Sequence, residues 1–402
     1  MKGFALVVLR SIKQSSMIYW DYNATAPLRP RVKEKVLEAM EKYAGNPSST
    51  HSMGQASRAY VENVRRICAD TIGVKSSELI FNGSATEANF SILWGTWLTH
   101  RQKNPTGTRK FLGSSLEHSS MVKNIHFMKE FEGVEFVELP LYSDGSLDLE
   151  GTEKLLQTEK FWLCSLYAAC NESGIIYPWQ QLASLCKKYH TPFHCDMVQL
   201  LGRIPFSLKE NNGVTSATFA FHKSGGVKGV GLLYVSAGAQ WTPVLHGGGQ
   251  EKKRRSGTEN ILGIASIEGI IEELPALIDL YQHQVRRVRD EFETRLLKEI
   301  PSTKIVGHQL ERLPNTSYLI LPGLASDIML MGLDVHGVAA SAGSACSSGL
   351  STSSSSLLRL GFTEEEARSA IRFSLGESST LSQIGEVIAA IKTTRERMLG
   401  AA

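Results

Sequence analysis

The chain has few cysteines and no spacing that would join them. Six cysteines are spread over 402 residues, and no two of them stand in a Cys-x-x-Cys pair. A secreted scaffold held together by disulfides needs a denser framework, so we expect a reducing, cytoplasmic compartment. Five of the six lie in apolar or strand-like surroundings and are expected to be buried packing residues. These are Cys68, Cys164, Cys170, Cys186 and Cys195.

Long apolar runs and a strong net charge are also missing. No stretch approaches the ~20 apolar residues that a membrane helix needs. The formal net charge is only +3, and no basic stripe interleaved with aromatic residues occurs, which argues against direct binding of nucleic acid. The densest basic cluster is at 252–255, and the only low-complexity segment is a serine-rich run at 351–356.

Residues 1–16 have an unusual composition. They are apolar at 4–9, carry Lys2, Arg10 and Lys13, and contain no acid. Because two basic residues follow the apolar stretch and no small-x-small cleavage site is present, the pattern does not predict a secretory signal. An organelle-targeting leader and an upstream start codon with Met17 as the true start both remain open, and we favour the second.

Short apolar runs alternate with helical patterns over most of the chain. Strand-like runs occur at 78–81, 110–113, 161–167, 193–195, 217–221 and 231–235, and a helical stripe occupies 30–43. This alternation predicts an α/β fold in which helices cover a mostly parallel sheet. From about residue 261 the pattern changes to a long helix at 264–297, a strand at 316–321 and a final helix at 381–398.

The length of the chain and this change of pattern favour two domains over one compact core. We expect a large domain at 31–270 and a smaller α+β C-terminal domain at 271–402. The segment at 17–30 is expected to pack with the small domain.

Cys346 is the exception among the cysteines. It lies in Ser-Ala-Gly-Ser-Ala-Cys-Ser-Ser-Gly (341–349), which has no large apolar residue to anchor it and leads into the serine-rich run. Gly and Ser favour loop conformations, so we expect the thiol on a long flexible loop where a thiolate can react. An incidental thiol on a plain surface loop explains the segment equally well.

Two predicted strand ends carry residues suited to a phosphate and to a cation. Residues 83–86 (Gly-Ser-Ala-Thr) form a small-residue turn before a helix, where backbone N–H groups suit an anion. A simple helix N-cap would have the same sequence. Asp196 ends a short apolar run, where it either needs a cationic partner or caps the next helix.

Lys223 and Arg372 also lie on predicted strands. Lys223 ends an apolar run shortly before two glycines, so its amine could be desolvated and activated as a nucleophile, although most lysines lie on the surface. Arg372 lies inside an apolar run, where its guanidinium suits a bidentate carboxylate or an internal salt bridge. In chain order the four segments supply a phosphate turn, an acid, a lysine and an arginine, which a pyridoxal-phosphate site requires.

These segments resemble the cysteine desulfurases of the NifS/IscS type, members of the class V aminotransferases within the aspartate aminotransferase-like fold type I family of pyridoxal-phosphate enzymes. The matching motifs lie at 21–27, 46–51, 85–89, 117–118, 171–174, 222–223, 247–251 and 255–258, and the resemblance extends to Arg372. The Gly-Ser-Ala-Cys segment with its serine-rich tail resembles the group with a mobile cysteine loop. The Arg-x-Gly-x-His-Cys motif of the other group is absent.

The resemblance implies a binding site for pyridoxal 5'-phosphate in the large domain. Lys223 would be the Schiff-base lysine, and Asp196 would pair with the pyridine nitrogen. His118 would stack on the ring and move protons, while Gln199 would contact the ring oxygen. The phosphate would be held by Ala85, Thr86 and His222, with Thr258 supplied by the partner subunit of a homodimer.

The resemblance also implies the substrate and the reaction. Asn171, beside the cofactor, and Arg372 would bind the carboxylate region of L-cysteine. Cys346 would attack the sulfur of the cofactor-bound cysteine, which leaves a persulfide on Cys346 and L-alanine as the product. Catalysis would thus depend on Cys346, Lys223 and His118.

The sequence departs from the family pattern around the cofactor. Ala220 stands where the family usually has Ser, and Asn-Gly-Ser at 82–84 replaces the usual Thr-Ser-Gly. The residues after Lys223 also differ, with Ser-Gly-Gly-Val at 224–227. Losing one neutral hydrogen bond costs about 1 kcal/mol, which would weaken cofactor binding unless Ser224 or Ser84 compensates.

Three alternatives to a desulfurase remain open. Selenocysteine lyases share these motifs, an aminotransferase would leave the loop thiol unexplained, and a degenerate binding protein would account for the changes around Lys223. We expect a homodimeric, cytoplasmic cysteine desulfurase that passes persulfide sulfur to an acceptor protein for iron–sulfur cluster or thio-cofactor assembly. No metal, membrane or direct nucleic-acid partner is expected.

Overall fold

The computed structural model describes residues 17–209, 213–343 and 355–399. Within them, the larger sheet has seven strands in the order β2-β8-β7-β6-β5-β3-β4. These are β2 (Leu79–Asn82), β3 (Lys110–Gly113), β4 (Glu135–Glu138), β5 (Leu163–Ser165), β6 (Phe193–Asp196), β7 (Ser216–Ala220) and β8 (Gly231–Val235). Neighbours pair in parallel except at β8, which is antiparallel to β2 and β7. The predicted α/β fold with a mostly parallel sheet is confirmed.

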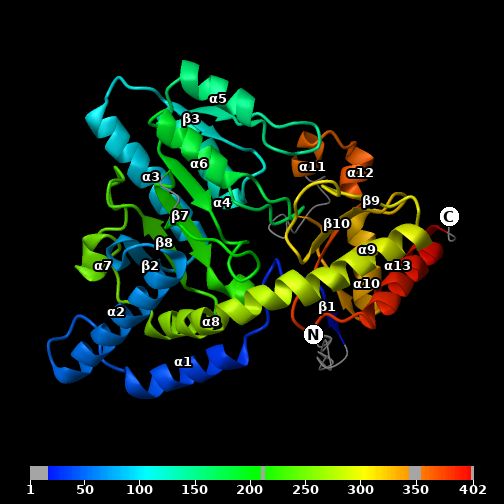
Figure 1. Ribbon diagram of the computed structural model, residues 1–402, viewed down its shortest axis with the longest axis horizontal. Helices are drawn as coiled ribbons and strands as arrows, with labels where there is room; N and C mark the ends of the chain where they lie inside the picture. The colour runs from blue at the N-terminus through cyan, green and yellow to red at the C-terminus, as the bar shows by residue number, and fades with distance from the viewer. Residues whose placement is uncertain (1–16, 210–212, 344–354, 400–402) are drawn as a thin grey trace, which may run out of the picture.

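Helices bury both faces of this sheet (Figure 1). They are α2 (Ser52–Ile72), α3 (Ala85–Lys103), α4 (Ser119–Glu132), α5 (Leu149–Thr158), α6 (Trp179–Lys188) and α8 (Ile261–Leu280). Along β8, Leu232 and Tyr234 join the core shared with α2, α6 and α8, whereas Leu233 and Val235 join the core shared with α3 and α4. Successive strand residues point to opposite faces, so short apolar runs of this kind supply both cores.

A further core forms around a smaller antiparallel sheet. Within the described residues its order is β12-β10-β9, formed by β9 (Lys304–Ile305), β10 (Thr316–Ile320) and β12 (Ala370–Ser374). Its apolar residues cluster with those of α9 (Arg286–Glu299), α10 (Ser326–Val335) and α13 (Gln383–Leu399). In Figure 1 this part lies to the right, in yellow to red. The strand predicted at 316–321 and the helix predicted at 381–398 are confirmed to within two residues at each end.

One continuous helical run joins the core of the larger sheet to that of the smaller one. α8 leads directly into the π-helical turn η4 (Tyr281–Val285) and then into α9. The long helix predicted at 264–297 is therefore confirmed, although the π-helical turn in its middle was not expected. Ile270 and Leu274 lie in the core of the larger sheet, whereas Leu277 and Tyr281 lie in that of the smaller sheet. The domain boundary proposed near residue 270 thus falls inside α8.

The N-terminal segment at 17–30 contacts both parts of the molecule. β1 (Ile18–Tyr19) pairs in parallel with β11 (Val338–Ala339), and the Trp20 ring packs edge-on against Phe292 and Phe373. The chain then crosses to the larger sheet, where α1 (Pro30–Lys42) runs along α8 (Figure 1). The stretch between β1 and α1 therefore passes between the two sheets.

Short helical elements complete the described chain. They are η2 (Ser76–Glu78), η3 (Phe221–Ser224), α7 (Gln250–Lys253), α11 (Ser355–Arg359) and α12 (Glu364–Arg368).

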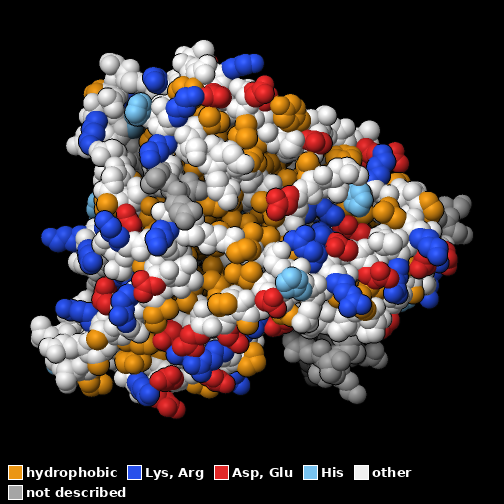
Figure 2. All heavy atoms as spheres, viewed as in Figure 1, with side chains coloured by type: hydrophobic (Ala, Val, Ile, Leu, Met, Phe, Trp, Pro, Cys, Tyr) orange, Lys and Arg blue, Asp and Glu red, His pale blue; other side chains and the backbone are white. Residues whose placement is uncertain are grey.

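Figure 2 shows acidic and basic side chains interspersed over the face it presents. Ion pairs such as Arg31–Glu272 and Lys35–Glu272 connect α1 with α8. In the part of the chain that the structure describes, no helix combines the length and the apolar character needed to cross a membrane.

Candidate active site

A cavity of about 330 Å³ lies at the carboxyl ends of the parallel strands, beside the smaller sheet. Ligand sites of α/β proteins lie at this edge because the loops that follow the strands converge there. Nine of the eleven predicted site residues line the cavity. They are Ala85, Thr86, His118, Asn171, Asp196, Gln199, His222, Lys223 and Arg372. The structure thus brings together residues from both sheets and from the N-termini of α3 and α4.

Lys223 lies in η3, directly after β7. Its Nζ donates hydrogen bonds to the carbonyl oxygens of Asn23 (2.9 Å) and Ala24 (2.7 Å). Gly225 follows with a φ of +92°, and a Cβ at this position would lie 2.4 Å from Cγ of Arg29. The glycine after Lys223 that departs from the family pattern therefore permits a tight turn against the N-terminal segment.

Asp196 ends β6 and is only 7% exposed. Its Oδ1 accepts a hydrogen bond from the backbone N–H of Val198 (3.0 Å), and its Oδ2 accepts one from Nδ2 of Asn89 (2.9 Å). No salt bridge to Asp196 occurs within the described residues. A buried carboxylate without a cationic partner is suited to a protonated ring nitrogen of a ligand.

His118 caps the N-terminus of α4. Its Nδ1 accepts a hydrogen bond from the backbone N–H of Ser120 (3.2 Å) and lies 2.8 Å from the Ser120 hydroxyl oxygen. Both contacts hold the imidazole at the start of the helix, where it lines the cavity.

The N-terminus of α3 presents hydrogen-bond donors to the cavity. Ser84 caps the helix by accepting a hydrogen bond from the backbone N–H of Glu87 (3.1 Å). The N–H groups of Ala85 and Thr86 make no hydrogen bond among the described residues. Unused N–H groups at the positive end of a helix dipole favour an anion such as a phosphate.

Ser224 and Ser84 differ in whether their hydroxyls could replace the one that is missing at Ala220. Ala220 lines the cavity, so its methyl group stands where a hydroxyl is usual. The buried hydroxyl of Ser224 points elsewhere and donates to the carbonyl oxygen of Leu201 (2.8 Å). Ser224 therefore presents no hydroxyl proton to the cavity. Ser84 does line the cavity, and its hydroxyl still has a proton to donate.

His222 lies next to Lys223 and is half-buried. Burial, and secondarily the positive charge of Lys223, lower the pKa of its imidazole to about 4. Its Nδ1 lies 3.2 Å from the hydroxyl oxygen of Thr25. The ring is therefore neutral near pH 7 and carries one N–H donor.

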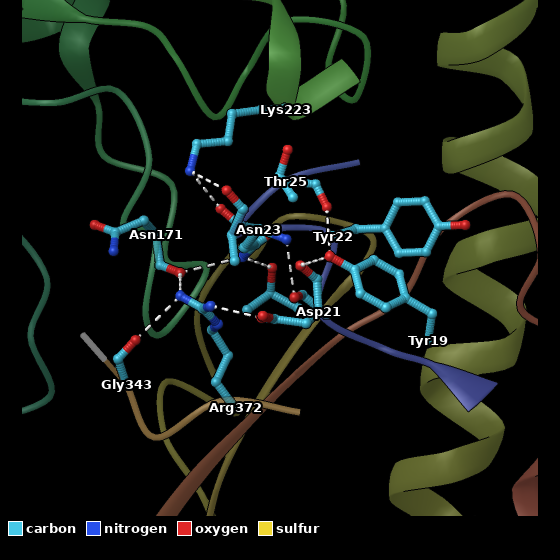
Figure 3. A network of polar contacts seen from close by, with 12 residues as sticks. Tyr19, Asp21, Tyr22, Asn23, Thr25, Asn171, Lys223, Gly343 and Arg372 are labelled. Atoms are coloured by element: carbon cyan, nitrogen blue, oxygen red, sulfur yellow. Dashed lines mark hydrogen bonds and ion pairs between the residues drawn. The ribbon is translucent and has the colours of Figure 1, made fainter. Parts of the chain in front are cut away.

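Arg372 reaches the cavity from β12 and is only 2% exposed. Its Nη2 donates to Oδ1 of Asp21 (2.8 Å), and its Nη1 donates to the carbonyl oxygens of Asn171 (3.0 Å) and Gly343 (3.1 Å), as Figure 3 shows. Its Nε has no hydrogen-bond partner among the described residues. A buried guanidinium with an unused donor is suited to a further carboxylate.

Asn23 lies at the junction between the two halves of the site (Figure 3). Its side-chain Nδ2 donates to the carbonyl oxygen of Asn171 (3.1 Å), and its own carbonyl oxygen accepts from Lys223. Asp21, two residues earlier, holds Arg372. The N-terminal segment therefore connects the lysine of the larger sheet with the arginine of the smaller one.

Glu117 is a buried carboxyl group in the cavity lining to which the sequence assigned no role. Burial, with a smaller contribution from the charge of Asp196, raises its pKa to about 8. Its Oε1 accepts a hydrogen bond from the Ser165 hydroxyl (2.7 Å), and its Oε2 has no partner among the described residues. Near pH 7 the group is therefore mostly protonated and does not add a full negative charge beside Asp196.

Gln199 is oriented by a buried arginine. Arg203 is 1% exposed and donates from Nη1 to Oε1 of Gln199 (2.6 Å). This contact fixes the amide oxygen of Gln199 on the side of Arg203. The amide nitrogen, Nε2, therefore points the other way and lies 3.4 Å from the carbonyl oxygen of Asn23. Gln199 therefore presents a donor where the resemblance expects a contact to a ring oxygen.

Five residues of the site received no role from the sequence. They are Asp21, Asn23, Asn89, Glu117 and Arg203. The signal that could have found several of them is a polar side chain among apolar neighbours, because such a group must be paired when it is buried. Asn89 and Glu117, each next to an apolar residue in the sequence, have this pattern.

Two predicted residues do not belong to the described lining. Cys346 lies outside the described residues; the described chain breaks after Gly343, beside Arg372, and resumes near Glu172, a lining residue that accepts a hydrogen bond from the Ser356 hydroxyl. Thr258 is exposed and lines a separate cavity of about 120 Å³. Its role as a residue supplied by a partner subunit stays a prediction.

Nearly the whole chain is similar to proteins of one family. The aminotransferase class V model matches residues 18–387. The cysteine desulfurase IscS of Dictyoglomus turgidum is 34% identical over 381 residues, which cover 95% of this chain and 95% of that protein. The structure of a NifS-like protein from Rickettsia africae has a TM-score of 0.81 at 33% identity and covers 94% of this chain and 99% of that one. The structure of SspA in complex with cysteine has a TM-score of 0.77 at 25% identity, with 90% and 100% covered.

Proposed function

The chain belongs to the class V aminotransferases and, among them, to the pyridoxal-phosphate-dependent cysteine desulfurases, and on this premise we propose that it converts L-cysteine to L-alanine and leaves a persulfide on Cys346. The observation that carries the proposal is the meeting of Lys223, Asp196 and Arg372 in one cavity. The C–S bond of the substrate breaks and an S–S bond forms on the enzyme. One cysteine and one thiol therefore give one alanine and one persulfide, without a further oxidant.

The donors and acceptors of the cavity fit pyridoxal phosphate. The unused N–H groups of Ala85 and Thr86 would hold the phosphate, Asp196 the ring nitrogen, and Lys223 the carbonyl carbon. Further hydrogen bonds would come from His222 to the phosphate and from Gln199 to the ring oxygen. When bound, the cofactor supplies an electron-withdrawing ring that stabilises negative charge on the carbon next to the substrate's amino group.

Arg372 would bind the carboxylate of L-cysteine. A carboxylate oxygen of Asp21 already lies 2.8 Å from its Nη2, which supports this assignment because the position accepts such a group. The unpartnered Nε leaves a second donor for a bidentate contact. Asn171 would help to position the same end of the substrate, since it lines the cavity and its carbonyl oxygen holds the guanidinium.

Lys223 and His118 would move the protons that the reaction requires. One proton leaves and later returns to Cα of the substrate, and one must reach Cβ to complete the methyl group of alanine. An amine and an imidazole that line the same cavity are suited to these transfers, because a general acid or base must come within hydrogen-bond reach of the reacting atom.

Cys346 would act as the thiolate that takes the sulfur. Its segment leaves the described structure at Gly343, whose carbonyl oxygen accepts from Arg372. Cys346 follows Gly343 by three residues, and three residues span at most about 11 Å, so the length of the chain is compatible with a thiol that reaches the substrate held by Arg372.

A homodimer would complete the site by adding Thr258 from the partner subunit. Thr258 is exposed and follows a turn in which Glu251, Lys252 and Lys253 have φ values of 48°, 58° and 67°. Such left-handed conformations of residues other than glycine persist only where the surroundings hold them. Here Glu251 is anchored by two hydrogen bonds from Arg65, at 2.6 and 2.8 Å. A loop fixed in this way is suited to presenting Thr258 to a second subunit.

The persulfide sulfur would pass to an acceptor protein for iron–sulfur cluster or thio-cofactor assembly. A reducing, cytoplasmic compartment suits this chemistry, because Cys346 must be a free thiol before each turnover. The five cysteines within the described residues are buried and unpaired, which supports such a compartment.

Turnover of L-cysteine by the full chain, reconstituted with pyridoxal phosphate and supplied with a thiol reductant, tests the proposal. The wild type should form alanine and sulfide in equal amounts. Cys346→Ala should keep the visible absorbance of the bound cofactor and lose sulfide formation, because the thiol is needed only for the sulfur. Ser353→Ala, in the serine-rich run, serves as the matched control and should resemble the wild type.

Three outcomes would contradict the proposal or favour another of the functions that the sequence left open. Sulfide formation by Cys346→Ala at the wild-type rate would refute the role of Cys346. Much faster turnover of selenocysteine than of cysteine, with little dependence on Cys346, would identify a selenocysteine lyase instead. A protein that stays colourless after incubation with excess cofactor would be a binding protein and not an enzyme of this class.

A further inference from the structure

Asn89 lies at the centre of a buried hydrogen-bond network beneath the proposed cofactor site. It is fully buried on α3, one turn after Ala85 and Thr86, whose N–H groups would hold the phosphate. Its Nδ2 donates both to Oδ2 of Asp196 (2.9 Å) and to the hydroxyl oxygen of Ser120 (2.9 Å). Its Oδ1 lies 3.1 Å from Nε2 of His194. One amide thus contacts the proposed partner of the ring nitrogen and, through Ser120, the side chain of His118.

The partners of this amide determine its orientation. An ionised Asp196 only accepts hydrogen bonds, so the amide must turn its NH₂ group towards Asp196 and its oxygen towards His194. His194 must then carry its proton on Nε2. Its Nδ1 is left to accept from the hydroxyl of Ser216, at 2.9 Å. Burial lowers the pKa of His194 to about 3, so the ring stays neutral and keeps this arrangement near pH 7.

The same reasoning determines the tautomer of His118. The backbone N–H of Ser120 can only donate, so Nδ1 of His118 is an acceptor. The Ser120 hydroxyl accepts from Asn89, and its own proton is directed to the same Nδ1. The proton of the neutral His118 ring is therefore on Nε2. A directed chain of donors runs from Ser216 through His194, Asn89 and Ser120 to His118.

We propose that Asn89 is a positioning residue that couples Asp196 to His118, fixing the carboxylate that would hold the cofactor's ring nitrogen and directing the Ser120 hydroxyl proton to Nδ1 of the imidazole that would donate from Nε2. The inference rests on the proposed function, because the two residues act on the cofactor and the substrate. It adds a physical link between them, since one side chain sets the geometry of both.

Asn89→Asp separates positioning from simple packing. The replacement has nearly the same shape and keeps an acceptor for His194, but it has at most one O–H in place of two N–H donors. It also brings a second carboxyl group to Asp196, so at most one of the two contacts, to Asp196 or to Ser120, can persist. We expect the dissociation constant of pyridoxal phosphate to rise about tenfold or more, because the carboxylate of Asp196 either loses a charge-assisted hydrogen bond or shares a proton with the new carboxyl group.

The ¹⁵N resonances of the His118 ring give a readout that does not depend on activity. In the full-length apoprotein with ¹⁵N-labelled histidine, the wild-type His118 should show an unprotonated Nδ1 and a protonated Nε2. Asn89→Asp should keep this tautomer, because the backbone N–H of Ser120 still donates to Nδ1, but should shift the Nδ1 resonance, because the Ser120 hydroxyl is no longer directed there by the amide of Asn89. Ser120→Ala, which removes only the branch to His118, should disturb the His118 signal and leave the affinity for the cofactor near that of the wild type.

Thr96→Val is the matched control on the same helix. Thr96 is also buried on α3 and makes no hydrogen bond to Asp196, Asn89 or Ser120, so its variant should keep the wild-type affinity and His118 spectrum. The inference is overturned if Asn89→Asp retains the wild-type cofactor affinity and the wild-type Nδ1 resonance of His118. That result would leave the proposed function intact, whereas a wild-type protein that binds no pyridoxal phosphate would refute the function itself.

Discussion

Glu117 shows at the scale of one residue how burial changes a charge. A carboxyl group in an ordinary setting is ionised near pH 7, but Glu117 is enclosed beside Asp196 and its pKa rises to about 8. A neutral acid is easier to bury than an ion. Glu117 thereby avoids placing a second full negative charge beside Asp196.

This raised pKa makes the stability of the protein depend on pH. An unfolded Glu117 releases its proton near pH 4.5, whereas the folded protein holds it up to about pH 8. Between these values the folded state binds one proton more than the unfolded state. Glu117 therefore lowers the free energy of unfolding by about 1.4 kcal/mol for each unit by which the pH rises. The contribution is fully present below the unfolded pKa and is lost as the pH rises through the folded one.

Glu117→Gln should remove this dependence. Urea unfolding of the apoprotein at several pH values should show the variant gaining stability relative to the wild type as the pH rises from about 5 to about 8. Glu365→Gln, at an exposed position on α12, is the control and should follow the wild type. Parallel curves for Glu117→Gln and the wild type would show that Glu117 is ionised in the folded protein.

Motif residues could be predicted from the sequence at this scale, whereas their supporting residues could not. Lys223, Asp196 and Arg372 each stand out because a charged group on an apolar strand needs a partner. Arg203 gave no such signal, because an arginine that follows a glycine reads as a surface residue. Only the fold shows that it is buried against Gln199.

At the scale of elements, one glycine allows helices α1 and α8 to pack closely. Gly269 of α8 faces Val32 of α1, and a Cβ at Gly269 would lie 2.9 Å from Cα of Val32. Backbone atoms cannot move aside as a side chain can. The glycine is therefore required by the close approach of the two helices, although glycine weakens a helix by about 1 kcal/mol relative to alanine.

Gly269→Ala should destabilise the protein in spite of its better helix propensity. Overpacking costs about 1–3 kcal/mol, which exceeds the gain in propensity, so the midpoint of urea unfolding should fall. Gly385→Ala is the matched control. Gly385 lies exposed on α13 with no atom within 4 Å of a new Cβ, and this change should be neutral or stabilising by up to about 1 kcal/mol. A stabilised Gly269→Ala protein would contradict the close approach of α1 and α8.

Most elements could be predicted because their patterns are local. The apolar runs at 110–113 and 231–235 coincide with β3 and β8, and the helical stripe at 30–43 with α1. The π-helical turn η4 could not be predicted, since its residues keep a helical pattern and only the hydrogen-bond spacing changes. The left-handed turn of α7 was also missed, because Glu251 and Lys252 are residues that rarely adopt it.

At the scale of the whole molecule, the N-terminal segment joins the two parts of the site. Asp21 and Arg372 are 351 positions apart in the sequence, yet their side chains form a salt bridge at 2.8 Å. Such a contact has no local pattern, so the sequence could supply the residues but not their meeting. The same segment accepts both hydrogen bonds from Nζ of Lys223 that Figure 3 shows. The positions of Lys223 and Arg372 therefore depend on one stretch of chain.

The fate of the substrate sulfur tests the central claim most directly. The holoenzyme is mixed with L-cysteine that carries a heavy sulfur isotope, stopped after one turnover and digested for peptide mass spectrometry. We predict one labelled sulfur on the peptide that contains Cys346 for each molecule of alanine formed. Alanine formed while the label never resides on Cys346, or a label on one of the buried cysteines instead, would contradict the account.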